Sequence, residues 1–202
     1  MFFSILPLQA AEVHLSVAAS MSDAFKELAA AFIADHPGVT MLPNFGSSGS
    51  LAKQGAQGAA ADLFDSAHPK WMTYLETEGK IAPQTVRDLV KNTLVLVGPQ
   101  TVAVNSLNDL DALRLIALGS PRSVPAGQYA EQAMRAAGVY ERLAAAKKLV
   151  MAKDVRQALL YADRGEVDCA FVYRTDALLA EKAVVLYAVP ANLHDPISYP
   201  WG

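Results

Sequence analysis

The sequence contains a single cysteine, Cys169, among its 202 residues. One cysteine cannot form an intrachain disulfide, so no disulfide framework holds this chain together. Cys169 lies inside the apolar run VDCAFVY, which is typical of a small buried side chain in a β-strand. The fold must therefore depend on apolar packing, which a hydrophobic content of 52% allows.

Positive charge and paired histidines are also scarce. Lysine and arginine total 17 against 20 acidic residues, which gives a net charge of −3. This balance excludes a strongly basic surface for nucleic acid or membrane, and any anionic ligand must be held by local groups. The four histidines (His14, His36, His68 and His194) are scattered, so no pair has the spacing of a histidine metal site.

The sequence has no apolar run long enough to span a bilayer. Its first residues, MFFSILPLQAAEV, resemble the end of a secretory signal, with an apolar stretch before small residues but without a basic start. We therefore expect residues 1–11 to be a signal-peptide remnant, cleaved after Ala10 or Ala11, and the protein to be periplasmic. A cytosolic protein with an uncleaved N-terminus is the alternative. No cysteine follows the predicted cut, so no lipid anchor is expected.

Apolar periodicity predicts strands and helices that alternate along the chain. Strand patterns at 13–20, 39–45 (interrupted by Pro43) and 61–67 alternate with helical patterns from Asp23 to the DHPG sequence, at 50–57 and at 68–79. The second half has predicted strands at 92–99, 114–121, 147–152, 167–173 and 183–190, with helices at 106–113, 124–138, 154–165 and 174–180. This alternation predicts an α/β fold of two lobes, each a mainly parallel sheet flanked by helices.

Small or hydroxyl-bearing residues recur at the predicted strand-to-helix turns, which read AAS-MSD, GSSGS-LAK, SVPAG-QYA, AKD-VRQ and VY-RTD. In a parallel sheet such turns meet at one edge, where helix N-termini present free N–H groups and the positive end of the helix dipole. Several of them together can bind an anion without lysine or arginine. The alternative is that serines such as Ser20 and Ser22, and also Asp154, only cap their helices.

The segment GSSGSLAK (46–53) also suggests other kinds of site. It lacks the spacing of a phosphate loop, and the flanking strand and helix patterns disfavour a flexible linker. Gly46 and Ser48 begin a G-x-S-x-G nucleophile elbow, but Ser50 replaces its second glycine. Ser50 and Lys53 match the S-x-x-K pattern of serine–lysine hydrolases, although no S-D-N or K-T-G partner is present. A serine hydrolase that uses Ser48, or Ser50 with Lys53, is a remote alternative.

Seven stretches in order along the chain resemble the periplasmic molybdate-binding proteins of molybdate ABC transporters. They are VAASMSDAFKELAAAF, FGSSGSLAKQ, ADLFDSAHPKWM, NTLVLV, SVPAGQYAEQAM, DVRQALLYADRGE and FVYRTDA. The resemblance covers the chain from about Val13 to Ala188. It implies the two-lobed periplasmic-binding-protein fold, with residues 12–97 as the first lobe and 98–190 as the second. Residues 191–202 would begin a return to the first lobe, and the expected final strand and helix would be missing after YPWG.

The resemblance also implies a ligand set for a tetrahedral oxyanion. Ser20 and Ser48 would bind through hydroxyl and backbone N–H groups, Ala126 and Val155 through their N–H groups, and Tyr173 through its hydroxyl. Such a site suits molybdate or tungstate and would reject sulfate by size, because Mo–O bonds are longer. The implied protein is not an enzyme, has no cofactor, is a monomer, and delivers its ligand to a membrane permease. A binding protein for another oxyanion, such as sulfate or phosphate, is the alternative.

Some residues near the motifs need a separate interpretation. Arg122, Arg156 and Arg174 adjoin three of them, but the family uses no cationic ligand, so we expect Arg156 to pair with a carboxylate instead. Gly55 replaces a more usual apolar residue and should weaken its short helix by about 1 kcal/mol. Asp65 lies in a predicted strand where an apolar residue is expected.

Overall fold

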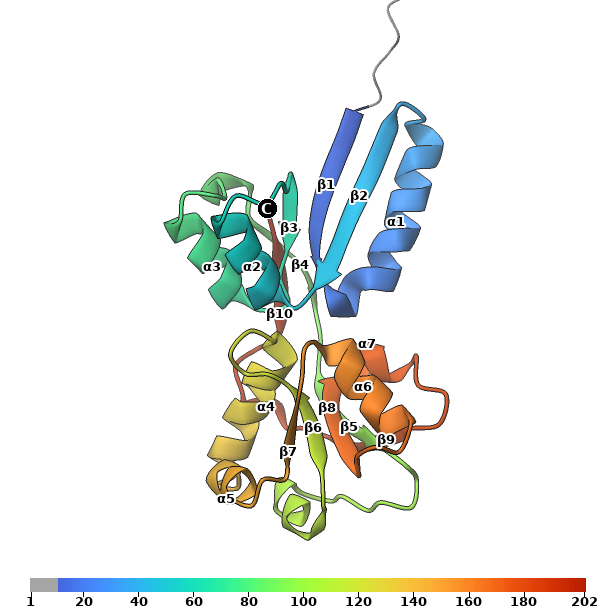
Figure 1. Ribbon diagram of the computed structural model, residues 1–202, viewed down its shortest axis with the longest axis vertical. Helices are drawn as coiled ribbons and strands as arrows, with labels where there is room; N and C mark the ends of the chain where they lie inside the picture. The colour runs from blue at the N-terminus through green and yellow to red at the C-terminus, as the bar shows by residue number, and fades with distance from the viewer. Residues whose placement is uncertain (1–10) are drawn as a thin grey trace, which may run out of the picture.

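Residues 11–202 are described by the computed structural model, and they form two α/β lobes (Figure 1). The predicted signal remnant lies outside the described residues except for Ala11. The first sheet has the order β2-β1-β3-β10-β4 and the second the order β7-β6-β8-β5-β9. The strands are β1 (Ala11–Ala18), β2 (Val39–Gly46), β3 (Leu63–Asp65), β4 (Arg87–Lys91), β5 (Leu94–Gly98), β6 (Ile116–Gly119), β7 (Leu149–Ala152), β8 (Cys169–Tyr173), β9 (Val184–Ala188) and β10 (Ser198–Trp201).

Each sheet has helices on both of its faces (Figure 1). In the first lobe, α1 covers one face and α2 with α3 covers the other; in the second lobe α4 and α6 lie on opposite faces. The α-helices are α1 (Ser22–Asp35), α2 (Ser48–Ala56), α3 (Pro69–Thr77), α4 (Pro125–Ala136), α5 (Tyr140–Ala145), α6 (Val155–Asp163) and α7 (Arg174–Ala177). Short 3₁₀ helices are η1 (Ala19–Met21), η2 (Pro83–Thr85), η3 (Leu107–Ala112) and η4 (Ala191–Leu193). No helix within residues 11–202 is both long and apolar enough to cross a membrane.

Both sheets are mixed and not mainly parallel as predicted, because one reversed strand in each makes two of the four pairings antiparallel. In the first sheet β1 is parallel to β2 and β3, whereas β10 is antiparallel to β3 and β4. In the second sheet β6 is parallel to β7 and β8, whereas β5 is antiparallel to β8 and β9. The reversed strand is in each case the one through which the chain enters from the other lobe. The two-lobed fold predicted from the alternation of strands and helices is confirmed.

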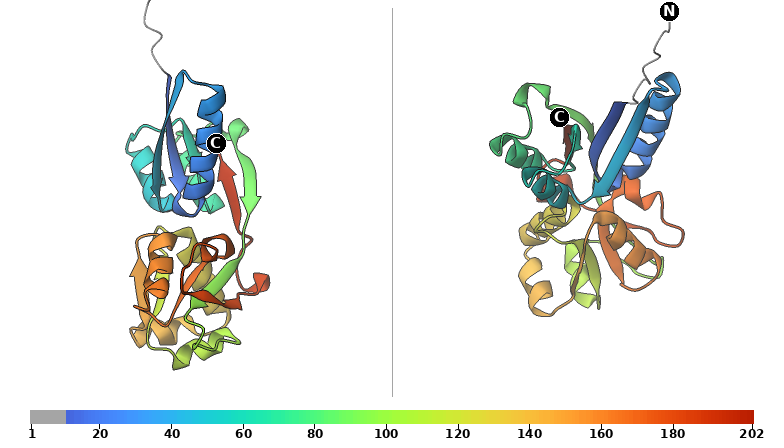
Figure 2. Two further views of the ribbon diagram at one scale, coloured as in Figure 1. Left: turned by 90° about the vertical axis from the view of Figure 1, so that its right-hand side faces the viewer. Right: turned by 45° about the horizontal axis from the view of Figure 1, so that its top comes forward.

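The chain crosses between the lobes twice, in two segments that lie side by side (Figure 2). The first crossing is at Asn92–Thr93, between β4 and β5, and the second lies between β9 and β10. The N–H of Asn92 donates to the carbonyl oxygen of Ile197 at 3.3 Å, which joins the two crossings. The predicted lobe boundary after residue 97 is wrong, because β5 belongs wholly to the second sheet. Its apolar residues Leu94–Val97 are fully buried there, as a strand with both faces covered requires.

Other differences from the predicted elements have local causes. β2 continues through Pro43 because β2 is an edge strand, where one side of the backbone needs no hydrogen-bonding partner. β4 is an edge strand whose residues are all exposed, so it has no apolar pattern by which to predict it. Cys169 is fully buried in β8, as predicted, and burial raises the pKa of its thiol to about 12.

Candidate functional site

A small pocket lies between the lobes, at the carboxyl ends of β1, β2 and β3 from the first lobe and β6, β7 and β8 from the second. The N-termini of α2, α4 and α6 also end at the pocket, so N–H groups without a partner in their own helix meet there. The lining residues are Ala18, Ala19, Ser20, Gly46, Ser47, Ser48, Ala67, Val124, Pro125, Ala126, Asp154, Val155 and Tyr173.

All five residues of the predicted ligand set line this pocket. Ser20 lies in η1 at the end of β1, and Ser48 is the first residue of α2. Ala126 is the second residue of α4, Val155 is the first residue of α6, and Tyr173 is the last residue of β8. The fold therefore brings together two turns of the first lobe and three of the second, from positions 20 to 173 of the sequence.

The serine hydroxyls of these turns do not cap the helices. The N-cap residue of α1 is Met21, so neither Ser20 nor Ser22 has the predicted capping role. At α2 the N-cap is Ser47, whose hydroxyl donates to the Ser50 hydroxyl at 2.8 Å and accepts no backbone N–H of the helix. The Ser48 hydroxyl oxygen accepts the Ala67 N–H at 3.0 Å, so the Ser48 proton is available for another acceptor.

Asp154 is the exception, because its carboxylate does cap a helix, as predicted. It accepts the N–H of Gln157 at 2.8 Å at the start of α6. Asp154 is the one charged residue in the pocket lining within the described part of the chain, since lysine, arginine and histidine are absent from it. The pocket is thus formed by neutral donors, with one carboxylate that is already bound to a backbone N–H.

Tyr173 presents a buried hydroxyl from the second lobe. Its side chain is 1% exposed, and within residues 11–202 its hydroxyl has no hydrogen-bond partner. Burial raises the pKa of Tyr173 well above its ordinary value, so the hydroxyl keeps its proton at neutral pH. A buried donor without a partner is costly unless a ligand accepts from it, and this donor borders the pocket.

Ser20 is connected to the interlobe crossing by residues that the sequence did not suggest. The Ser20 and Tyr199 hydroxyls are 3.0 Å apart, and Tyr199 belongs to β10. The side-chain amide of Asn92 donates to the Tyr199 hydroxyl at 3.4 Å and to the Thr175 hydroxyl at 2.8 Å. Asn92 begins the stretch NTLVLV, but that pattern gives it no contact with Tyr199, which reaches Ser20 only because the chain returns to the first sheet.

The lobes are in direct contact beside the pocket. The N–H of Gly49 in α2 donates to the carbonyl oxygen of Ser123, which precedes α4, at 2.9 Å. A Cβ atom at position 49 would lie 2.6 Å from that oxygen and 2.5 Å from the Trp71 ring. A residue without a side chain is needed for this approach, so the lobes meet through the second glycine of GSSGS.

The family model of bacterial extracellular solute-binding proteins matches residues 13–202. The chain belongs to this family. Two curated relatives are a Bacillus subtilis protein, YvgL, named as a candidate substrate-binding lipoprotein of an ABC transporter, and the Haemophilus influenzae molybdate-binding protein ModA. The first is 41% identical, over 93% of this chain and 72% of its own length. The second is 38% identical, over 94% of this chain and 77% of its own length.

A solved structure agrees with these relatives. The periplasmic molybdate-binding protein of Azotobacter vinelandii superposes with a TM-score of 0.81 at 25% identity, over 94% of this chain and 84% of its own. The resemblance to molybdate-binding proteins inferred from the seven sequence stretches is therefore confirmed. Relatives of this solute-binding protein are transport proteins.

The contacts of Ser48, Ser50 and Lys53 do not support the two serine-hydrolase alternatives. Ser50 accepts from Ser47, and the Lys53 ammonium lies 5.8 Å from the centre of the Trp71 ring, in cation–π geometry. The hydroxyl of Ser48 has the Ala67 N–H as its partner and not a basic side chain. Between residues 11 and 202 no group of three or more histidine, cysteine, aspartate or glutamate side chains could hold a metal ion.

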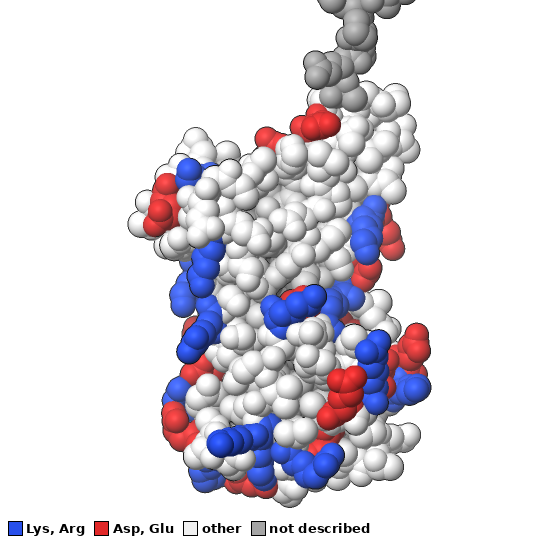
Figure 3. Space-filling model, in the orientation of Figure 1, with Lys and Arg blue, Asp and Glu red and all other residues white. Residues whose placement is uncertain are grey.

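The arginines near the motifs do not line the pocket. Arg156 pairs with Asp23 and Asp176, as predicted, with N–O distances of 3.0 and 2.8 Å. On the face shown in Figure 3, a small group of charges of both signs lies where the lobes meet, whereas much of the upper lobe is uncharged. The positively charged side chains therefore lie outside the pocket lining.

Proposed function

We propose that this protein binds molybdate, and also tungstate, in the pocket between its lobes and delivers it to the membrane permease of an ABC transporter. The observation that supports this most directly is the convergence of Ser20, Ser48, Ala126, Val155 and Tyr173 on one small pocket without a cationic side chain. In this proposal the protein acts in the periplasm as a monomer, without catalysis or a cofactor.

The donor set suits the chemistry of the ligand. Molybdate is a fully deprotonated dianion at neutral pH, so its four oxygens accept hydrogen bonds and have no proton to donate. The pocket offers hydroxyl protons of Ser20, Ser48 and Tyr173 and backbone N–H groups at the starts of three helices. Hydrogen bonds from such donors to a charged oxygen contribute about 1.5–3 kcal/mol each, so several of them can hold a dianion without a counter-charge.

Both lobes contribute donors, so ligand binding and lobe closure are coupled. Ser20 and Ser48 belong to the first lobe, whereas Ala126, Val155 and Tyr173 belong to the second. Separation of the lobes about the crossing at Asn92–Thr93 would divide the donor set and release the anion. This gives the permease a simple means of unloading the protein.

Isothermal titration calorimetry with sodium molybdate, tungstate, sulfate and phosphate tests the proposal. We expect tight binding of molybdate and tungstate and none of sulfate, because the longer Mo–O and W–O bonds fill a pocket that sulfate would leave loose. Absence of heat with both molybdate and tungstate would disprove the proposed function. Tighter binding of sulfate or phosphate than of molybdate would instead support the other oxyanion class.

A matched pair of variants separates ligand contacts from structural contacts. Tyr173→Phe should weaken molybdate binding by about 1–3 kcal/mol with little change in melting temperature, because its hydroxyl has no protein partner. Ser48→Ala should weaken binding by a similar amount and also lower the melting temperature of the ligand-free protein, because the Ala67 N–H loses its buried acceptor. Titration and thermal melting measure both effects, and unchanged affinity in either variant would remove that residue from the site.

A further inference from the structure

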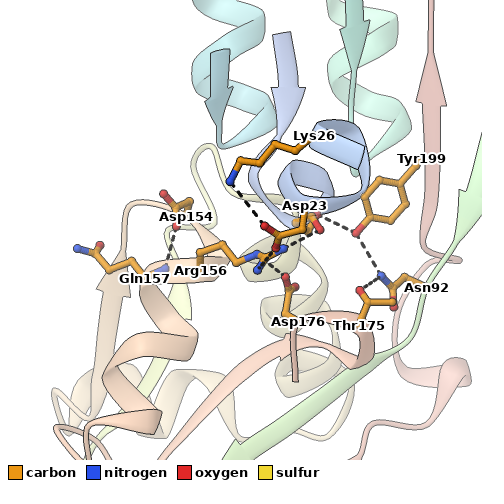
Figure 4. Close-up of polar contacts among 10 residues, drawn as sticks. Asp23, Lys26, Asn92, Asp154, Arg156, Gln157, Thr175, Asp176 and Tyr199 are labelled. Carbon is orange, nitrogen blue, oxygen red and sulfur yellow. Dashed lines mark hydrogen bonds and ion pairs between the residues drawn. The ribbon is translucent and has the colours of Figure 1, made fainter. Parts of the chain in front are cut away.

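The side chain of Arg156, in the second lobe, extends to the first lobe (Figure 4). Arg156 is the second residue of α6, directly after Val155. Its Nη2 atom donates to the carbonyl oxygen of Ser20 at 3.1 Å, and its Nη1 atom lies 3.0 Å from a carboxylate oxygen of Asp23. Both contacts are with the first lobe, so this one side chain from the second lobe spans the junction.

The Arg156 guanidinium also contacts a buried carboxylate of its own lobe. Asp176 in α7 is fully buried, and its Oδ1 atom lies 2.8 Å from the Arg156 Nε atom. Burial raises the pKa of Asp176 to about 7, whereas the nearby arginine opposes that change. Among the ion pairs of residues 11–202, Arg156 is the one cation paired with Asp176. This contact lies within the second lobe, whereas the contacts with Ser20 and Asp23 cross to the first.

The contacts of Arg156 link three of the turns that form the pocket. Ser20 is contacted directly, Val155 is its neighbour in the chain, and Tyr173 lies three residues before Asp176. A bond to the Ser20 carbonyl fixes the peptide plane that follows Ser20, and with it the turn that carries the Ser20 hydroxyl. The guanidinium itself is absent from the pocket lining.

We propose that Arg156 is a positioning residue for the anion site, and that it clamps the Ser20 turn of the first lobe to the Val155 and Tyr173 turns of the second. The identity of the anion rests on the proposed function, whereas the clamp itself rests on the contacts between lobes. When the lobes separate, the contacts with Ser20 and Asp23 break, but the contact with Asp176 remains. The clamp therefore slows ligand release more than it speeds ligand capture.

The main test uses a double variant, because replacing Arg156 alone would leave the buried carboxylate of Asp176 without its cation. Arg156→Gln combined with Asp176→Asn removes the clamp together with the buried carboxylate behind it, and Asp23→Asn removes the ion pair with the first lobe but keeps the bond to the Ser20 carbonyl. The matched control is Arg135→Gln, because Arg135 pairs with Glu131 and Glu141, which all lie in the second lobe. Stopped-flow measurement of molybdate association and dissociation is made on the full chain for each variant.

We expect the double variant to release molybdate about tenfold or more faster than the wild type, with association changed less than about threefold. Asp23→Asn should accelerate release by a smaller factor, since Asp23 is half-exposed and salt already screens it. Added salt should accelerate release from the wild type more than from the double variant. Release from the double variant at the rate of the Arg135→Gln control would overturn the proposal.

A second measurement does not depend on the ligand. Small-angle X-ray scattering of the ligand-free proteins should show a larger radius of gyration for the double variant than for the wild type and the Arg135→Gln control. Equal radii would overturn the clamp, even if molybdate binds. A larger radius in the double variant together with no binding of molybdate by the wild type would keep the clamp and reject the proposed function.

Discussion

The two lobes contribute to one pocket but differ in the cores that support it. In the second lobe a single buried cluster runs through β5, β6, β8, α4 and α6, with Leu94–Val97 fully buried, and it extends across the junction to Ala18, Ala67 and Tyr199 of the first lobe. The first lobe has two small clusters on opposite faces of its sheet. One contains Leu51, Ala52, Phe64, Trp71, Met72 and Leu75, and the other contains Leu15, Val17 and Phe25.

The surface of the first lobe shows the same difference. Large apolar side chains of α1 remain in solvent: Leu28 is 58% exposed, Phe32 41% and Ile33 37%. Phe25 is the one buried residue of this helix. Local stability follows the apolar area that each element buries, so the first lobe should open more easily than the second. The Ser20 and Ser48 turns therefore belong to the less stable lobe, and ligand binding should stabilise that lobe most.

The largest test of this comparison is a pair of leucine truncations. Leu96→Ala in the second lobe should lower the free energy of unfolding by about 2–5 kcal/mol, because it leaves a cavity at a fully buried site. Leu28→Ala in α1 should change it by less than about 0.5 kcal/mol, because that side chain is mostly in solvent. Urea unfolding measures both. Similar losses in the two variants would show that Leu28 is packed as tightly as Leu96 and would contradict the comparison.

The second test compares the two buried carboxyls. Asp176 in the second lobe faces Arg156, whereas Asp65 in the first lobe is fully buried with the Ala18 N–H as its one hydrogen-bond partner in the described structure. Burial raises the pKa of Asp65 to about 7 from 3.8. A raised carboxyl pKa means that the native state binds more protons than the unfolded state, so stability falls as pH rises from about 4 to about 7.

Removal of the Asp65 charge should therefore stabilise the protein at high pH. We expect Asp65→Asn to raise the free energy of unfolding by roughly 2–4 kcal/mol at pH 8 and by much less at pH 5. Burial also raises the pKa of Asp176 to about 7, so Asp176→Asn should gain stability over the same pH range, but by less, because it leaves Arg156 without its buried partner. A gain for Asp65→Asn that is the same at both pH values would contradict a titrating Asp65.

The smallest expected effect concerns two glycines of the same helix, α2. Gly49→Ala should weaken molybdate binding by about 1–3 kcal/mol, because the new Cβ atom would press on both Trp71 and the Ser123 carbonyl of the other lobe. Gly55→Ala is the control, since its Cβ atom would meet Leu75 at an ordinary 3.5 Å. It should instead stabilise the helix by roughly 0.5–1 kcal/mol. Calorimetric titration and urea unfolding measure these effects, and equal affinities in the two variants would argue against a lobe contact at Gly49.

Local patterns predicted the elements whose physical cause is local. The apolar run Leu94–Val97 reads as a buried strand because both faces must be covered, and Asp154 reads as a helix cap because its carboxylate lies next to free N–H groups. β4 has no such pattern, because an exposed edge strand is defined by its neighbour β10 and not by its own residues. The lobe boundary failed for the same reason, since an apolar strand does not indicate which sheet it will join.

The sequence by itself determined the α/β alternation, the hydroxyl-rich turns at the strand ends and, through resemblance, the five residues that meet in the pocket. Each of these depends on residue type and spacing along the chain. Only the tertiary structure decided that Tyr199 would reach Ser20, that Gly49 would contact the second lobe, and that Arg156 would span the junction to Ser20 and Asp23. These contacts join residues that lie far apart in the sequence, so their geometry is set by how the two lobes pack and not by any local pattern.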